Sequence, residues 1–156
     1  MAPFTIIRPA EEKDLDKIIE MMIQIAAHEN ADFDPYDKKE RYNNMLFGEV
    51  PRFCCLVAEG AGIVCGCATY SKELSVFAAE DYLRLNSLYI MPDYRNRGIG
   101  KKMINALFEV AMDKGYNSMQ CYTPAMNTGA INFYLDMGAK TKNAVRFYFT
   151  DLRQQS

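Results

Sequence analysis

The sequence predicts an α/β protein in which a mixed sheet carries helices on its faces. Short apolar runs alternate along the chain with longer segments whose apolar residues recur at helical spacing. Near the middle, a glycine-rich turn over residues 94–102 joins a strand-like run directly to a helical one. The length of 156 residues suits one core, so we expect a single domain over residues 1–156.

The first third of the chain predicts one strand followed by two helices. Residues 5–8 form a strand-like run that Pro9 stops. Residues 11–29 carry apolar side chains at helical spacing, and their first turn is acidic, as helix starts prefer. Pro35 suits the first turn of a helix, so residues 36–47 are predicted as the second helix.

The middle third predicts a hairpin and the strand that feeds the glycine-rich turn. A Gly-Ala-Gly turn separates the apolar runs 53–59 and 63–70, which is typical of an antiparallel hairpin. Residues 71–80 show no regular pattern. The run 82–91 is again strand-like and leads straight into the turn.

The last third predicts two helices and two strands. Apolar residues line one face of residues 103–114, and Gly115 ends that helix. The short helix that follows is capped by Asn127 or Thr128. The remaining predicted elements are a strand over residues 118–123, the short helix itself over 130–137, and a last strand over 145–151.

The composition is that of an ordinary globular protein with nearly balanced charge. Apolar residues make up 49% of the chain, charged residues 24%, and the net charge is -2. That balance argues against nucleic acid or an anionic membrane as the main partner. No apolar run approaches the roughly 20 residues of a membrane span, and no leader-like start is evident, so we expect a cytoplasmic protein.

The five cysteines lie in apolar, strand-like runs, which indicates reduced and buried thiols. Cys65 and Cys67 share one face of a predicted strand, but the chain has one histidine and no second spaced pair of ligands. We therefore expect no metal site. A nucleophilic cysteine is the lesser alternative, because none has an obvious base nearby in the sequence.

The glycine-rich turn has the features of an anion-binding loop. Its glycines let the backbone approach an anion, and the unpaired N–H groups of the first helical turn point at it. Four cations crowd a helix start, where the macrodipole disfavours positive charge, so an anion is expected there. The spacing matches neither the Rossmann nor the P-loop fingerprint. The alternative is a solvated turn with surface cations, which are Arg95, Arg97, Lys101 and Lys102.

Several short motifs occur in order along most of the chain. They are Ile7-Arg8-Pro9-Ala10, Cys55-Leu56-Val57-Ala58-Glu59, Met91-x-Asp93-Tyr94-Arg95-x-x-Gly98-Ile99-Gly100, Val110-Ala111-Met112 and Asn132-Phe133-Tyr134-x-x-x-Gly138-Ala139. Taken together, they resemble the GCN5-related N-acetyltransferase (GNAT) superfamily, and most of all its diamine (spermidine/spermine) and thialysine acetyltransferase branch. The resemblance implies the GNAT fold, a mixed and mostly antiparallel central sheet flanked by about four helices, with acetyl-CoA as the acyl donor.

The resemblance implies cofactor roles for three segments. The strand that ends at Ile90 would pair its backbone with the pantetheine arm, and it would splay from its neighbour to leave a slot for the acyl chain. The loop would cradle the pyrophosphate, with Lys102 and the loop arginines adding charge, and residues 127–131 would meet the far side of the cofactor. The residues expected to bind it are Leu88, Tyr89, Ile90, Arg95, Asn96, Arg97, Gly98, Ile99, Gly100, Lys101, Asn127 and Ala130.

Tyr134 is the residue that we expect to be catalytic. In the family, the corresponding tyrosine lies near the thioester sulfur and protonates the leaving thiolate, a step for which the reaction needs an acid. A tyrosine on a short helix is otherwise a packed aromatic with a wet hydroxyl. The resemblance also implies direct transfer in a ternary complex, with backbone N–H groups around Tyr89 polarising the carbonyl.

The chain departs from the diamine branch at the residues that meet the amine. That branch has an acidic pair that recognises the polyamine and helps to remove its proton, whereas Asn86 and Ser87 are uncharged. Glu29 matches a substrate-binding acid, and His28 stands where an aromatic is usual. Either could accept the proton, although His28 could instead cap the carbonyls at a helix end. Two further acids with no better claim are Glu80 and Asp81.

Together these features predict an acetyl-CoA-dependent acyltransferase that acetylates a primary amine of a small molecule, such as a diamine, a polyamine or a lysine-like compound. Two alternatives stay open. One is acetylation of a protein N-terminus or lysine, and the other is a non-catalytic module that only binds acyl-CoA. The resemblance also implies a homodimer.

Overall fold

The computed structural model describes residues 4–154, which fall into two compact units, one up to Pro124 and the other from Ala125 onward. The described residues contain four α-helices and one mixed five-stranded sheet. The predicted α/β class, with a mostly antiparallel sheet, is therefore confirmed. Over the same residues, no helix has the length and apolar character needed to cross a membrane.

The sheet follows the order of the sequence, β1-β2-β3-β4-β5. The first three pairings are antiparallel, whereas β4 and β5 are parallel. A parallel neighbour requires a crossover, and helix α3 (Ile99–Asp113) provides it. The strands are β1 (Thr5–Pro9), β2 (Cys54–Gly60), β3 (Ile63–Ser75), β4 (Glu80–Ile90) and β5 (Met119–Cys121).

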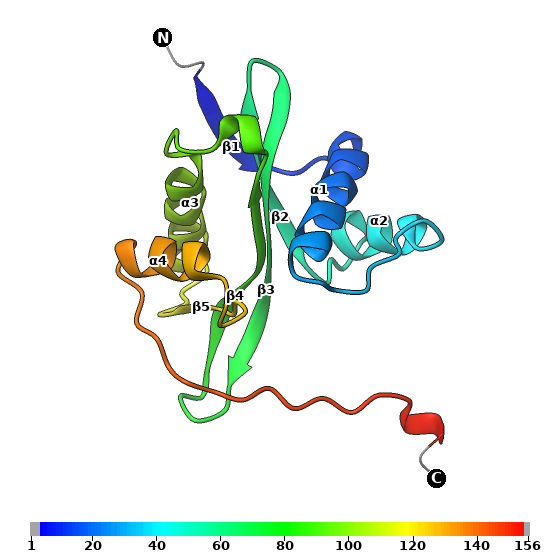
Figure 1. Ribbon diagram of the computed structural model, residues 1–156, viewed down its shortest axis with the longest axis vertical. Helices are drawn as coiled ribbons and strands as arrows, with labels where there is room; N and C mark the ends of the chain where they lie inside the picture. The colour runs from blue at the N-terminus through cyan, green and yellow to red at the C-terminus, as the bar shows by residue number, and fades with distance from the viewer. Residues whose placement is uncertain (1–3, 155–156) are drawn as a thin grey trace. The chain divides into compact units, whose positions relative to one another are not determined.

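Helices of the first unit lie on both faces of the sheet (Figure 1). Helix α3 covers one face, and its buried side chains Met103, Ile104 and Leu107 recur at the spacing that predicted this helix. Helices α1 (Leu15–His28) and α2 (Lys39–Phe47) cover the other face. The sheet is thus buried from both sides, which fits its nearly continuous apolar central strands.

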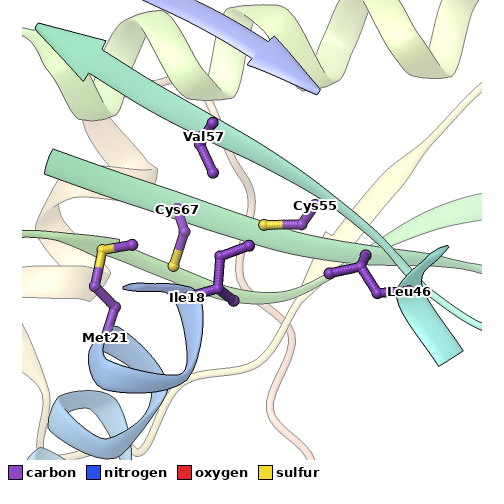
Figure 2. Packing of buried hydrophobic residues seen from close by; sticks show 6 residues of the cluster. All are labelled: Ile18, Met21, Leu46, Cys55, Val57 and Cys67. Atoms are coloured by element: carbon purple, nitrogen blue, oxygen red, sulfur yellow. The ribbon is translucent and has the colours of Figure 1, made fainter. Parts of the chain in front are cut away.

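The core under α1 and α2 contains two cysteines. Figure 2 shows the cluster, in which side chains from α1 and α2 meet those of β2 and β3. A hydrogen bond with Cys67, together with burial, raises the pKa of the Cys55 thiol well above its ordinary value. The five cysteines form no disulfide within the described residues, but Cys54 and Cys121 are only half-buried, so the expectation of burial is wrong for those two. The clustered residues are Ile18, Met21, Leu46, Cys55, Val57 and Cys67.

The stretch predicted as irregular, residues 71–80, contains the end of β3, a turn and the start of β4. Lys72 pairs with Asp81 at 3.6 Å across this hairpin, and Glu73 pairs with Arg84 at 3.8 Å. Cross-strand charge pairs therefore take the place of apolar alternation here. This is why the sequence pattern did not reveal a strand.

All four predicted helix starts shift in the structure. Helix α1 begins at Leu15, after a short 3₁₀ turn over Glu12–Asp14, and α4 (Thr128–Asp136) begins two residues early. Helix α3 begins four residues early, at Ile99, because Gly98 adopts a left-handed conformation and serves as its N-cap. Helix α2 begins three residues late, at Lys39. The Asp34 carboxylate accepts a hydrogen bond from the Tyr36 N–H at 3.2 Å, which keeps the Pro35 segment in a turn.

The last predicted strand, residues 145–151, is wrong. Residues 139–151 form no strand, and a short 3₁₀ helix, η3 (Leu152–Gln154), follows them. Val145, Phe147 and Phe149, whose alternation suggested the strand, are 77%, 82% and 78% exposed. Alternating apolar residues show that a segment could bury one face as a strand. A strand forms only where a neighbouring strand supplies hydrogen-bond partners for its backbone.

An ion-pair network centred on Arg8 ties β1, the start of α1 and β2 together. The Arg8 guanidinium contacts the Asp14 carboxylate at 2.7 Å and the Glu59 carboxylate at 2.7 Å. Asp14 also accepts the Glu11 N–H at 2.8 Å, and its side chain is 5% exposed. The hydrogen bond from Arg8 holds the pKa of Asp14 below its usual range, because it favours the ionised form.

Replacing this carboxylate, Asp14→Asn, should lower the free energy of unfolding at pH 7 by about 3 kcal/mol, because one partner of a buried pair is removed. The folded pKa of Asp14 is depressed, so its contribution is full above the unfolded value near 3.8 and is lost as the pH falls through the folded pKa. Urea unfolding from pH 7 to pH 3 should therefore show the gap between wild type and variant closing below pH 4.

Glu20→Gln is the matched control, because it breaks the exposed Lys17–Glu20 pair at 3.1 Å on the same helix. It should change the unfolding free energy by about 0.5 kcal/mol or less at every pH. A gap for Asp14→Asn that stayed constant down to pH 3 would rule out the linkage to this carboxylate.

Candidate functional site

Strand β4 has an open edge over its second half. It pairs with β5 only over Leu83–Leu85, opposite Met119–Cys121. Within the described residues, no strand pairs with the stretch from Asn86 to Ile90 on that side. Backbone groups that would complete the sheet are therefore left available along this edge.

A β-bulge lies where the open edge begins. The register between β3 and β4 passes from Tyr70 opposite Leu85 to Thr69 opposite Ser87, so Asn86 is the extra residue. A bulge bends its strand and increases the local twist. The bend thus coincides with the point at which the pairing of β4 with β5 stops.

Hydrogen bonds at the end of β4 show which backbone groups face the open edge. The Met91 N–H donates to the Cys65 carbonyl of β3 at 2.8 Å. Because backbone groups alternate in direction along a strand, those of Leu88 and Ile90 point away from β3. The Ile90 carbonyl accordingly accepts a hydrogen bond from the Arg95 Nε at 2.8 Å instead of from β3.

The loop after β4 places backbone N–H groups at the start of α3. Asn96 and Gly98 have positive φ angles of 59° and 77°, and such turns gather successive N–H groups into an anion-binding concavity. The Lys102 N–H donates to the Gly98 carbonyl at 3.1 Å. The N–H groups of residues 99–101 precede that bond and belong to the unpaired first turn of the helix. We call residues 96–101 the anion cradle, because this backbone geometry suits an anion.

The four cations of the loop are not equivalent. Arg95 lies over the Tyr89 ring at 5.4 Å from its centroid, and Arg97 lies over the Tyr94 ring at 5.5 Å. Lys101 and Lys102 are exposed on the first turn of α3. The two arginines are thus held on aromatic faces, a geometry that favours guanidinium groups.

A group of neutral polar side chains surrounds the bulge. Asn86 donates a hydrogen bond through Nδ2 to the Ser71 hydroxyl at 3.0 Å. The Ser87 hydroxyl bonds with the hydroxyl of Thr69, which is buried. The two positions that the sequence assigned to substrate are therefore held by hydroxyls of β3, and this neutral polar group bears no charge at neutral pH.

The four other residues considered for the amine lie at two places. His28 ends α1 and Glu29 is its C-cap, and both are exposed. Glu80 accepts a hydrogen bond from Asn117 at 3.2 Å, and Asp81 pairs with Lys72. Both acids begin β4, and at about 3.3 Å per residue they lie roughly 30 Å from its Ile90 end. They lie about 16–20 Å from Asn86, where the open edge begins.

The second unit contains the remaining predicted residues on helix α4 (Thr128–Asp136). The Asn127 Oδ1 accepts the Ala130 N–H at 3.2 Å, which confirms the predicted cap. Tyr134 and Phe133 make an edge-to-face contact with centroids 5.3 Å apart. In the part of the chain that the structure describes, no group of three or more His, Cys, Asp or Glu side chains is placed to hold a metal ion.

Two sets of contacts were not anticipated from the sequence. The first is the return of Arg95 to Ile90 and Tyr89, and the second is the pairing of Thr69 and Ser71 with the bulge. The first depends on the tight turn that follows β4, and the second depends on the register between β3 and β4, which the bulge shifts by one residue. The sequence contains one sign of the pairing of Thr69 and Ser71 with the bulge, which is that polar residues alternate along the chain after Ala68. Apolar residues do not alternate there, so this sign does not predict a strand.

The sequence is similar to those of known acetyltransferases. The sequence profile of the Acetyltransferase (GNAT) family matches residues 19–139. Thialysine N-epsilon-acetyltransferase of Mus musculus is 33% identical over 144 residues, which cover 87% of this chain and 84% of that protein.

Solved structures share the fold. A possible acetyltransferase from Clostridium difficile 630 has a TM-score of 0.81 at 21% identity, covering 95% of this chain and 98% of that one. Aminoglycoside N-acetyltransferase AAC(6')-Iy, solved in complex with CoA, has a TM-score of 0.77 at 19% identity and covers 97% of each chain.

Proposed function

The chain belongs to the acetyltransferase (GNAT) family and is an N-acetyltransferase, and we propose that it moves an acetyl group from acetyl-CoA to the primary amine of a small molecule. The amine is a diamine, a polyamine or a lysine-like compound, and the transfer is direct, within a ternary complex. The observation that carries this proposal is the open edge of β4, which leads into the anion cradle at the start of α3.

The residues of the first unit fit the acyl-CoA that this family uses. The pantetheine arm of acyl-CoA is extended and carries amide groups. It can form hydrogen bonds with the backbone of Leu88 and Ile90, in the way that an extended peptide adds a strand to a sheet edge. The N–H groups of residues 96–101 suit a pyrophosphate, since they converge at a helix start. When bound, acetyl-CoA would supply an activated thioester.

The protein's own groups would then manage charge and protons. Backbone N–H groups on the open edge would polarise the thioester carbonyl, as fixed donors stabilise developing negative charge. The Tyr134 hydroxyl would give its proton to the departing sulfur. Asn127, which caps α4, would keep the start of that helix ordered.

Two observations support the proposed substrate class, namely the name of a similar protein and the polar residues at the bulge. The thialysine acetyltransferase of Mus musculus acts, by its name, on a lysine analogue. Asn86 and Ser87 would meet the amine-bearing part of the substrate as hydrogen-bonding groups, so they recognise it without charge. The proton of the ammonium would pass through water to Glu29 or His28 at the exposed end of α1.

We also propose that residues 1–156 act as one GNAT domain and that the protein is a homodimer. The family profile extends over both units, from residue 19 to residue 139, which supports a single functional domain. The exposed Val145, Phe147 and Phe149 supply an apolar surface for association. Sedimentation of the full chain should give twice the monomer mass, and Phe147→Ser with Phe149→Ser should lower it; a monomeric wild type would refute the dimer.

The initial rate of thiol release from acetyl-CoA with a panel of amines tests the proposed function. The panel holds spermidine, short diamines, thialysine, lysine, arylalkylamines and peptides with free N-termini. A preference for one small amine supports the proposal. Turnover of peptides alone would replace it with protein acetylation, and coenzyme A binding without turnover of any amine would contradict it.

Tyr134→Phe should lower kcat by about 10²-fold or more, because the leaving thiolate loses its acid. The Kd for acetyl-CoA should stay within about twofold, since the ring remains. Tyr148→Phe, at an exposed tyrosine of the same unit, is the control and should leave both constants unchanged. Equal kcat values for the two variants would exclude Tyr134 as the acid.

Gly98→Ala should weaken coenzyme A binding about tenfold, because an L-residue at φ +77° is strained by about 1–2 kcal/mol and the cradle would relax. Gly62→Ala is a matched control: Gly62 has φ +78° in the β2–β3 turn, and neither glycine has an atom within 4 Å of an added Cβ. Titration calorimetry should show lost affinity for Gly98→Ala only. Equal affinities would mean that the geometry at Gly98 does not serve the anion.

A further inference from the structure

We propose that Arg95 is a positioning residue, which fixes the open end of β4 to the anion cradle and does not itself hold the pyrophosphate. This inference rests on the function proposed above. It assigns to the first arginine of the loop a task different from the charge contact that its place in the motif suggests.

The Ile90 carbonyl faces the open edge of β4 and accepts a hydrogen bond from the Arg95 Nε at 2.8 Å. A carbonyl oxygen can accept two hydrogen bonds, so this contact leaves Ile90 able to meet a ligand while holding its peptide plane in place. Arg95 thus acts on the edge through the last residue of the strand.

The Arg95 guanidinium also lies over the ring of Tyr89. The guanidinium carbon is 5.4 Å from the centroid of Tyr89, and Tyr89 packs against the core cluster beneath α1 and α2. Arg95 therefore contacts a side chain that the core itself holds in position. A planar guanidinium can stack on the ring and donate from Nε together, which an ammonium cannot do.

Backbone hydrogen bonds also shape the segment between Ile90 and Arg95. The Tyr94 N–H donates to the Met91 carbonyl at 2.9 Å, and the Arg95 N–H donates to the Pro92 carbonyl at 3.2 Å. These bonds close a tight turn, from which the Arg95 side chain returns to Ile90. Asn96, whose φ is +59°, begins the cradle immediately afterwards. Arg95 therefore sets where the cradle stands relative to the open edge.

Arg97 differs in this respect. It lies on Tyr94, at 5.5 Å from the ring centroid, and Tyr94 belongs to the same turn. This contact ties one part of the loop to another, whereas that of Arg95 ties the loop to the sheet. Arg97 is therefore a matched control, as an exposed arginine of the same motif stacked on a tyrosine at nearly the same distance.

The test measures two affinities in the full chain and in Arg95→Lys and Arg95→Gln. One ligand is acetyl-CoA, and the other is adenosine 3′-phosphate 5′-diphosphate, which carries the phosphates without the pantetheine arm and is measured by competition. If Arg95 positions the strand edge, both variants should lose about tenfold in affinity for acetyl-CoA, the worth of one charged hydrogen bond. Affinity for the arm-less nucleotide should stay within about twofold, and the salt dependence should not change.

Arg97→Gln, by contrast, should weaken both ligands and flatten the salt dependence, since it removes a charge from the cradle. The positioning role is overturned if Arg95→Lys binds acetyl-CoA like the wild type. It is overturned equally if Arg95→Gln weakens both ligands alike with a flatter salt dependence, because Arg95 would then act as a charge at the phosphates.

Tyr89→Leu gives a second measurement that leaves Arg95 in place. It removes the stacking ring, and it should weaken acetyl-CoA while sparing the arm-less nucleotide; loss of both, or of neither, contradicts the proposal. Urea unfolding of each variant identifies any general loss of stability. A wild type that fails to bind acetyl-CoA would refute the proposed function, whereas a wild type that binds it beside an unaffected Arg95→Lys refutes only this inference.

Discussion

The site depends on one constraint, which is that β4 loses its parallel neighbour halfway along its length. The pairing with β5 stops at Leu85, and the bulge at Asn86 bends β4 at the same point. Beyond it, the strand keeps β3 on one side, and on the other side no strand of the described residues pairs with it. An exposed edge is usually a liability in a sheet, and this edge leads directly into the loop where we propose that the anionic part of acyl-CoA binds.

The rest of the first unit keeps this edge in place. Helices on both faces bury the sheet, and the Arg8 network fastens β1 and the start of α1 to β2. Close to the edge itself, Gly66 of β3 leaves room for β4, since an added Cβ would lie 2.7 Å from the Ile90 side chain and 3.0 Å from the Tyr89 carbonyl oxygen. Close packing of the two strands therefore positions the end of β4.

Family membership gives the type of reaction, whereas we propose that a few side chains select the amine. The fold is shared with aminoglycoside acetyltransferases and the sequence with thialysine acetyltransferases, so the scaffold by itself does not select a substrate. In this chain the bulge carries Asn86 and Ser87, held by Ser71 and Thr69 of β3. In the proposed function, these groups would discriminate by shape and polarity, where a carboxylate pair would discriminate by charge.

Local sequence patterns determined most elements and the anion loop. Helical spacing predicted α1 and α3, and the glycines marked the anion loop, in which Gly98 adopts the positive φ that glycine tolerates best. The tertiary structure decided what depends on register and partners. It extended β3 through the charged residues of 71–75 and left residues 145–151 without strand structure. It also placed the Arg95 side chain in hydrogen-bonding contact with the Ile90 carbonyl. Pairing partners far apart in the chain, and a one-residue bulge, leave no periodic trace in the sequence.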